Sequence, residues 1–164
     1  MFKLKKIIIP LGILALLAFL GFNLTKNRLA PNVTFTTITG QKINMADLRG
    51  KVVLVNFWAT DCSVCVKEMP DLVNTYNAYK AKGFEVIAVA MPYDPPAQVL
   101  NYVTQKLLPF PVMHDGFGEM IMKFGGVTAT PTAYIFDKEG KQLQHTTGRL
   151  DFAKLNQLLD KELI

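Results

Sequence analysis

Cysteine and histidine, the usual ligands of structural zinc, are scarce in this chain of 164 residues, which contains two of each. A structural zinc site normally takes four Cys or His ligands that come as closely spaced pairs. Cys62 and Cys65 form one such pair, but His114 and His145 lie far from it and from each other in the sequence. The sequence therefore holds at most half of a zinc site, and we expect no metal and no cofactor.

The chain also lacks internal repeats and low-complexity tracts, and acidic residues are missing from its start. Five basic residues and no acidic residue precede Pro31, whereas the thirteen basic and thirteen acidic residues that follow it balance. The net charge of +5 thus belongs to the N-terminal segment alone. Because the remainder has no basic run and no basic patch interleaved with aromatic residues, nucleic-acid binding is not expected.

The N-terminal segment is typical of a membrane-directed sequence. Three lysines within residues 1–6 precede an apolar run from Ile7 to Phe22, which has the size of a signal-peptide core and approaches that of a membrane span. Arg28 occupies a position at which a small residue would favour cleavage, and the segment has no cysteine for lipid attachment. We therefore expect an uncleaved membrane anchor over residues 1–22, with a cleaved signal peptide as the alternative.

A polar linker is expected at residues 23–31, and residues 32–164 have the length of one domain. Basic residues that flank an anchor stay on the cytoplasmic side of the membrane. The expected location is the inner (cytoplasmic) membrane, with a single-pass N-terminal anchor and a domain that faces the periplasm or another extracytoplasmic space.

Hydrophobic patterning predicts strands and helices throughout residues 32–164. The expected strands are 33–38, 42–44, 51–58, 84–91, 110–113, 133–136 and 142–146, and the expected helices are 45–49, 62–82, 96–107, 119–124 and 151–163. The strand at 51–58 is apolar along nearly its whole length, which is typical of a strand buried on both faces. This order predicts an α/β fold with a central mixed β-sheet flanked by helices on both faces, an N-terminal β-hairpin extension and a βα insertion.

The two cysteines stand at the start of the helix that follows this buried strand, in the segment Phe57-Trp58-Ala59-Thr60-Asp61-Cys62-Ser63-Val64-Cys65. Free backbone N–H groups and the positive end of the helix dipole stabilise a thiolate at the helix N-terminus, so Cys62 is the expected nucleophile. Cys65 lies one turn further on the same side and can resolve a mixed disulfide. The arrangement predicts thiol–disulfide exchange.

Simpler interpretations of the cysteine pair fit less well. A purely structural disulfide across two residues would close a very small loop and constrain the chain little. Two unrelated buried thiols do not account for the Trp-x-x-x-Cys-x-x-Cys setting. A peroxidase of the peroxiredoxin type is also disfavoured, because its reactive cysteine normally follows a Pro-x-x-x-Thr/Ser-x-x pattern that is absent here.

Several segments of the chain are similar to those of a known protein family. The segment Val55–Pro70 resembles the active-site segment of the TlpA/ResA branch of the thioredoxin superfamily, and Val127–Thr132 resembles the cis-proline loop of that family. The similarity continues into Tyr134–Gly140 and covers about residues 30–164. It implies a thioredoxin-like fold and the activity of a membrane-anchored or exported thiol–disulfide oxidoreductase. Members act mainly as reductants in cytochrome c maturation or on cysteines of copper-site assembly proteins.

The resemblance also implies roles for individual residues. Cys62 would be the attacking thiol and Cys65 the resolving thiol. Glu68 matches an acidic residue of the family and would move protons and tune the thiol pKa from the helix face of Cys65. A solvated helix glutamate is the alternative for Glu68.

The substrate-binding part of the site follows from the same resemblance. Pro131 would form a cis peptide bond, with the backbone of Thr130 opposite Cys62, where it can pair with an extended substrate strand. Trp58 would also belong to this part of the site, where its side chain would pack beside the thiols.

Two residues depart from the family pattern. Asp61 stands directly before the first cysteine, where it could raise the pKa of the Cys62 thiol or cap the helix as a favoured N-cap residue. Asn56 occupies the strand position at which thioredoxin has a buried aspartate, so a proton relay would have to use Glu68 or water.

The expected function is the reduction of disulfides in partner proteins. A dithiol in an oxidising compartment needs an upstream reductant, and the resemblance implies a membrane thiol electron donor of the DsbD/CcdA type. An oxidase or isomerase of disulfides remains an alternative. A copper-binding chaperone on the same fold is a second one, although the two-residue gap between the cysteines and the lack of a nearby histidine argue against it.

Overall fold

The computed structural model describes residues 28–163 of the chain. The expected anchor at residues 1–22 and most of the expected linker lie outside the described residues. Within residues 28–163, no helix is both long enough and apolar enough to cross a bilayer.

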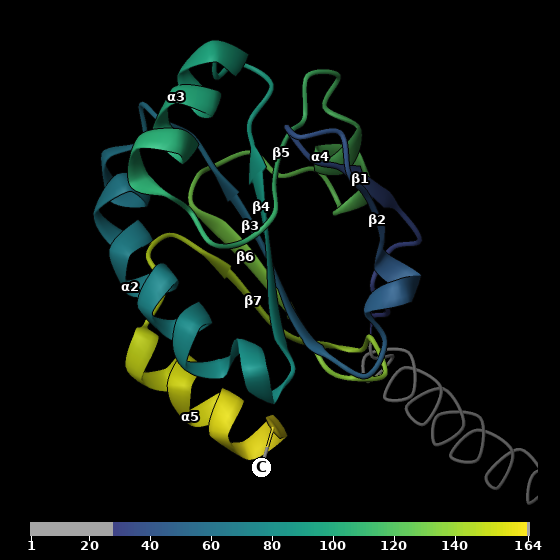
Figure 1. The fold of residues 1–164 in the computed structure, drawn as a ribbon. Coiled ribbons are helices and arrows are strands. Elements are labelled where there is room, and N and C mark those ends of the chain that lie inside the picture. The colour runs from purple at the N-terminus through teal and green to yellow at the C-terminus, as the bar shows by residue number, and fades with distance from the viewer. Residues whose placement is uncertain (1–27, 164) are drawn as a thin grey trace, which may run out of the picture.

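A five-stranded mixed sheet forms the centre of the molecule, with the strand order β5-β4-β3-β6-β7 (Figure 1). Its strands are β3 (Val52–Trp58), β4 (Phe84–Ala90), β5 (Val112–His114), β6 (Thr132–Phe136) and β7 (Gln142–Thr147). β4 is parallel to both β3 and β5, whereas β6 is antiparallel to β3 and β7. The C-terminal ends of β3, β4 and β5 and the start of β6 therefore lie at one edge of the sheet.

The central strand β3 divides the core into two parts. All seven residues of β3 are buried, as its apolar sequence predicts. Because successive side chains of a strand point to opposite faces, Leu54 and Trp58 pack into one hydrophobic cluster, and Val55 and Phe57 pack into another.

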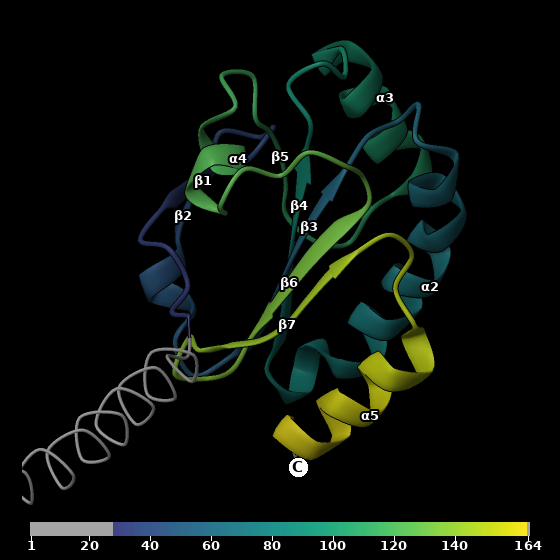
Figure 2. The same ribbon diagram turned by 180° about the vertical axis from the view of Figure 1, so that it is seen from behind.

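Helices α2 (Ser63–Tyr79), α3 (Pro96–Lys106) and α5 (Phe152–Leu163) lie on one side of the sheet (Figures 1 and 2). The 3₁₀ helix η2 (Lys80–Lys82) extends α2. The other side is covered by the hairpin of β1 (Thr34–Thr36) and β2 (Lys42–Asn44), by the 3₁₀ helix η1 (Met45–Leu48) and by α4 (Glu119–Lys123). The predicted α/β fold with helices on both faces and an N-terminal hairpin is confirmed.

Element boundaries differ from the prediction in a few places. Leu107 was expected within the third helix, but α3 ends at Lys106 and Leu107 is its left-handed C-cap, with φ 50° and 80% of its surface exposed. The strand expected at 110–113 begins two residues later, at Val112. Gly83 ends η2 with φ 103°, a conformation that glycine adopts more easily than other residues.

Candidate active site

Cys62 and Cys65 form a disulfide at the start of α2, with their Cα atoms 5.2 Å apart. Cys65 is fully buried, whereas Cys62 is partly exposed. This difference agrees with the predicted roles of an attacking and a resolving thiol, because Cys62 is the more accessible residue of the two.

Cys62 is itself the N-cap of α2. Its Sγ accepts a hydrogen bond from the Cys65 N–H, with an N···S distance of 3.2 Å. The sulfur thus receives a donor of the first helical turn, which favours the thiolate once the disulfide is reduced. The alternative in which Asp61 caps the helix is wrong, because Asp61 precedes the cap and its side chain is exposed.

The loop that carries Cys62 is bonded to the neighbouring loop after β4. The Thr60 N–H donates to Asp94 Oδ2 and the Thr60 hydroxyl donates to Asp94 Oδ1, each at 2.6 Å. Asp94 is 1% exposed. No motif in the sequence identifies Asp94 as a partner of the cysteine loop, and the only available signal is that parallel neighbouring strands end at the same sheet edge.

The Thr130–Pro131 peptide bond is cis, as the resemblance implied. Pro131 directly precedes β6, which starts beside the end of β3 because Thr132 pairs with Phe57. Among the hydrogen bonds of residues 28–163, none uses the N–H or C=O group of Thr130. These backbone groups are therefore free to pair with an added strand at the edge that carries the cysteines.

Tyr93 connects the loop after β4 to the cis-proline loop. Its hydroxyl lies 3.4 Å from Thr130 Oγ1, and 57% of its surface is exposed. Two loops beside the cysteine loop are thus in contact through an exposed aromatic side chain.

Glu68 is fully buried in α2 and is not the solvated helix glutamate considered as the alternative. Its Oε2 accepts a hydrogen bond of 3.1 Å from the Leu150 N–H, and within the described chain its Oε1 has no partner. Burial raises the pKa of the Glu68 carboxyl; the Leu150 hydrogen bond and the charge of Arg149 lower it, and the nearby Asp71 charge raises it further. The net pKa lies above the ordinary value.

Trp58 and Asn56 are buried on the same side of β3. Trp58 is fully buried and packs in the cluster that contains Cys65, with its ring centroid 5.2 Å from that of Tyr102. Its side chain is therefore placed to pack beneath the thiols rather than to touch a protein substrate. Asn56 is also fully buried, and neither atom of its amide has a hydrogen-bond partner among residues 28–163.

The two histidines take part in other contacts. His114 Nε2 lies 2.8 Å from the carbonyl oxygen of Asp94, and the ring of His145 stacks on Tyr134 with centroids 4.3 Å apart. Between residues 28 and 163, no group of three or more His, Cys, Asp or Glu side chains is arranged to hold a metal ion.

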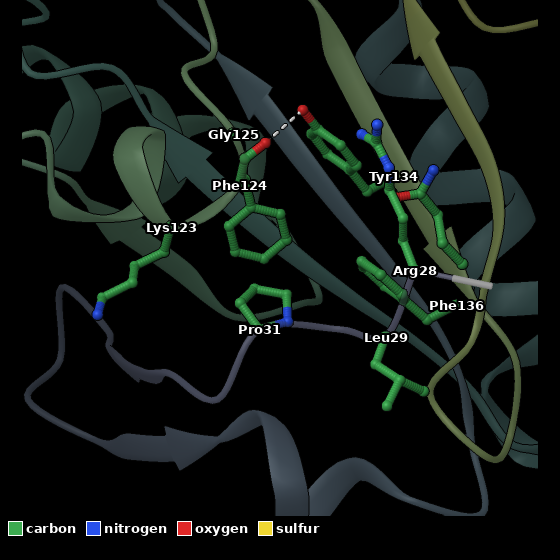
Figure 3. Close-up of a pocket in the computed structure, with 9 residues that line it drawn as sticks. Arg28, Leu29, Pro31, Lys123, Phe124, Gly125, Tyr134 and Phe136 are labelled. Atoms are coloured by element: carbon green, nitrogen blue, oxygen red, sulfur yellow. Dashed lines mark hydrogen bonds between the residues drawn. The ribbon is translucent and has the colours of Figure 1, made fainter. Parts of the chain in front are cut away.

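A separate pocket of about 170 Å³ lies on the side of the sheet opposite α2. Figure 3 shows Pro31, Phe124 and Phe136 around it, with the Tyr134 hydroxyl donating to the Phe124 carbonyl oxygen at 2.7 Å. No cysteine lines this pocket, so it does not belong to the redox site.

Comparison with known proteins agrees with this geometry. The AhpC/TSA family matches residues 27–144. The thiol-disulfide oxidoreductase ResA of Bacillus thuringiensis subsp. konkukian is 41% identical over 132 residues, covering 80% of this chain and 75% of that protein. ResA of Bacillus anthracis is 36% identical over 166 residues and covers 98% of this chain and 95% of that protein.

Solved structures show the same fold. A crystal structure of a thiol:disulfide interchange protein of the thioredoxin family from Chlorobium tepidum is 28% identical, with a TM-score of 0.77 over 85% of this chain and 99% of that chain. The thioredoxin domain of a thiol-disulfide oxidoreductase from Bacteroides vulgatus is 27% identical, with a TM-score of 0.71 over 84% of this chain and 97% of that chain.

The family match does not introduce a peroxidase centre. The residues seven and three positions before Cys62 are Val55 and Ala59, where a peroxidatic cysteine has proline and threonine or serine. The relatives and the fold instead agree with the Cys62–Cys65 pair as the reactive group. The chain belongs to the AhpC/TSA family and, within it, to the ResA-type thiol–disulfide oxidoreductases of thioredoxin-like fold.

Proposed function

We propose that this oxidoreductase works as a reductase of disulfides in partner proteins on the extracytoplasmic side of a membrane. The observation that carries the proposal is the asymmetry of the cysteine pair: a partly exposed Cys62 receives a helix N–H on its sulfur, and its partner Cys65 is fully buried. A pair of this kind lets a protein substrate reach one sulfur only, so the second sulfur is kept for resolution.

The reaction has two balanced steps. The Cys62 thiolate attacks one sulfur of the substrate disulfide, forms a mixed disulfide and expels the other substrate sulfur as a thiolate. Cys65 then loses its proton and attacks Cys62 Sγ, which releases the second substrate thiolate and forms the Cys62–Cys65 disulfide. Two electrons pass to the substrate, whose thiolates take up protons, and an upstream dithiol must supply two electrons for the next cycle.

Glu68 is proposed to accept the proton of Cys65. The two residues are one helical turn apart on α2 and both are buried. Burial raises the pKa of the Glu68 carboxyl, which brings it closer to the range of an effective proton acceptor. Its Oε1, which has no partner in residues 28–163, is the atom that would take the proton.

The substrate chain is proposed to lie along Thr130. The N–H and C=O groups of this residue make no other hydrogen bond in the described chain, and an extended peptide could pair with them as an added strand. Pairing at this point would hold the substrate disulfide at the edge of the sheet where Cys62 is exposed.

The cellular setting is part of the same proposal. Residues 1–22 would anchor the protein in the cytoplasmic membrane, and a membrane thiol donor of the DsbD/CcdA type would reduce the disulfide after each cycle. The proposed clients are proteins of cytochrome c or copper-site (cytochrome oxidase) maturation. Support for this setting comes from the basic, then apolar, N-terminal sequence and from the similarity to ResA proteins.

Trapping of mixed disulfides tests the proposal. Cys65→Ser should accumulate mixed disulfides with client proteins, because the resolving thiol is gone, whereas Cys62→Ser should trap none. The trapped proteins identify the clients, and the reduction potential of the wild-type pair decides the direction. A potential near that of DsbA, roughly −120 mV, would make the protein an oxidase and overturn the reductase proposal.

A further inference from the structure

Two similar turns lie side by side next to the redox pair. β3 is followed by a turn in which the Cys62 N–H donates to the Ala59 carbonyl oxygen at 3.2 Å. β4 is followed by a turn in which the Asp94 N–H donates to the Met91 carbonyl oxygen at 3.0 Å. Because β3 and β4 are parallel neighbours, both turns lie at the same edge of the sheet, and only the first carries a reactive residue.

The side chain of Asp94 joins the two turns. Thr60 is a central residue of the cysteine turn, and its N–H points out of the turn without a backbone acceptor in the described chain. Asp94 Oδ2 accepts this N–H, and Asp94 Oδ1 accepts the Thr60 hydroxyl, both at 2.6 Å. Each oxygen of the carboxylate is therefore bonded to the same residue, two positions before Cys62.

Burial and a hydrogen bond from His114 fix the position of Asp94 itself. It is 1% exposed, and His114 Nε2 donates to its carbonyl oxygen at 2.8 Å. Within residues 28–163 no cation forms a salt bridge with Asp94, and the groups that donate to its carboxylate are the N–H and the hydroxyl of Thr60. Hydrogen bonds to a carboxylate are short and strong. The two bonds to Asp94 therefore hold the cysteine turn firmly against the loop after β4.

We propose that Asp94 is a positioning residue for the attack by Cys62. Its carboxylate fixes the turn Ala59–Cys62 against the loop after β4. The sulfur of Cys62 is thereby held in a fixed position for attack on the disulfide of a protein substrate. Asp94 has this role only if Cys62 is the attacking thiol, as proposed above. Displacements of about 1 Å in a reacting group can change rates by roughly a hundredfold, so a rigid support is of value here.

Full-length reduced protein with Asp94→Ala or Asp94→Asn tests the role. Asp94→Ala should lower kcat/KM for the reduction of insulin disulfides by about ten- to a hundredfold. The rate of alkylation by iodoacetamide should stay within about threefold of wild type, because a small reagent needs a thiolate but no fixed approach geometry. Asp94→Asn should recover exchange to within about threefold, since its amide can still bond both groups of Thr60.

Asp115→Ala is the matched control. Asp115 is also buried, at 3% exposure, and its carboxylate also bonds two backbone N–H groups, those of Met120 and Ile121, but it lies in the loop after β5. This variant should lower the melting temperature without lowering kcat/KM at temperatures where it is folded. If Asp94→Ala fails to fold, Thr60→Val replaces it, because it removes one of the two bonds and should lower kcat/KM by about three- to tenfold.

Three outcomes overturn the role of Asp94. In the first, Asp94→Ala or its substitute exchanges disulfides as fast as wild type. In the second, Asp115→Ala is as slow as Asp94→Ala. In the third, Asp94→Asn is as slow as Asp94→Ala, in which case the charge matters rather than the position. A wild-type protein that does not reduce insulin faster than a free dithiol contradicts the proposed function instead, so the two failures are distinguishable.

Discussion

Two buried carboxylates lie near the cysteine pair, Asp94 in the loop after β4 and Glu68 in α2, and their hydrogen bonding differs. Both oxygens of Asp94 accept hydrogen bonds from Thr60. Glu68 accepts one bond, from the Leu150 N–H, and its Oε1 has no partner in the described part of the chain. A carboxylate with both oxygens bonded is suited to hold a loop, whereas a buried one with a free oxygen and a raised pKa is suited to carry a proton.

Asp94→Ala should produce the largest change in stability. Removing the carboxylate leaves the N–H and the hydroxyl of Thr60 without their charged acceptor beside a buried site, so the free energy of unfolding should fall by about 2–4 kcal/mol. Urea denaturation of the reduced protein measures this change. Asp61→Ala is the control, since Asp61 is exposed in the same turn, and its change should stay within about 0.5 kcal/mol. Equal losses of stability in Asp94→Ala and Asp61→Ala would contradict the view that the Asp94 carboxylate holds the cysteine loop.

Glu68→Gln should affect the chemistry more than the fold. The amide keeps an acceptor for the Leu150 N–H but cannot accept the proton of Cys65, so resolution of the mixed disulfide should slow by about a hundredfold. Single-turnover decay of a preformed mixed disulfide measures the rate. Glu139→Gln, at an exposed turn position, should leave it unchanged. An unaltered rate in Glu68→Gln would exclude Glu68 as the proton acceptor.

The raised pKa of Glu68 also predicts how stability depends on pH. Between the ordinary value of 4.5 and the raised pKa of the folded state, the folded protein binds more protons at this site than the unfolded chain. The contribution of Glu68 to the free energy of unfolding therefore falls as pH rises through that window. Glu68→Gln should remove this slope and gain stability relative to wild type toward neutral pH. Parallel urea curves of the two proteins at acid and neutral pH measure the slope, and an equal pH dependence would disagree with a raised pKa.

Arg149→Gln should cause the smallest change. The charge of Arg149 lowers the pKa of Glu68, so its removal should raise that pKa further and move the pH profile of the resolving step to higher pH. Arg149 is exposed and bonded to Asp71 at 3.6 Å, so screening should limit the effect at neutral pH to about threefold. The difference in the rate of the resolving step between Arg149→Gln and wild type should become smaller in high salt, because salt screens the charge of Arg149. A pH profile of the resolving step that moves to lower pH in Arg149→Gln would contradict the expected effect of Arg149 on the pKa of Glu68.

Local sequence was sufficient for much of the fold. The second hairpin strand at 42–44 and the buried strand ending at Trp58 were predicted at the observed positions, because hydrophobic period and turn residues act over short distances. The boundary at Leu107 was missed, since an apolar residue at helical spacing can also serve as a C-cap. Asp61 was considered as the helix cap for the same local reason, whereas the observed cap is the sulfur of Cys62.

The amino-acid sequence by itself determined the redox pair, because two cysteines at the start of a helix after a buried strand specify the chemistry through neighbouring residues alone. The family resemblance also pointed to Glu68, but only the tertiary structure decided that this carboxylate is buried and that Asp94 is bonded to the cysteine loop. The Thr60–Asp94 bonds join residues 34 positions apart, and the Leu150–Glu68 bond joins residues 82 positions apart. Burial and hydrogen bonding of a carboxylate depend on which distant segments pack against it, and no local pattern records that packing.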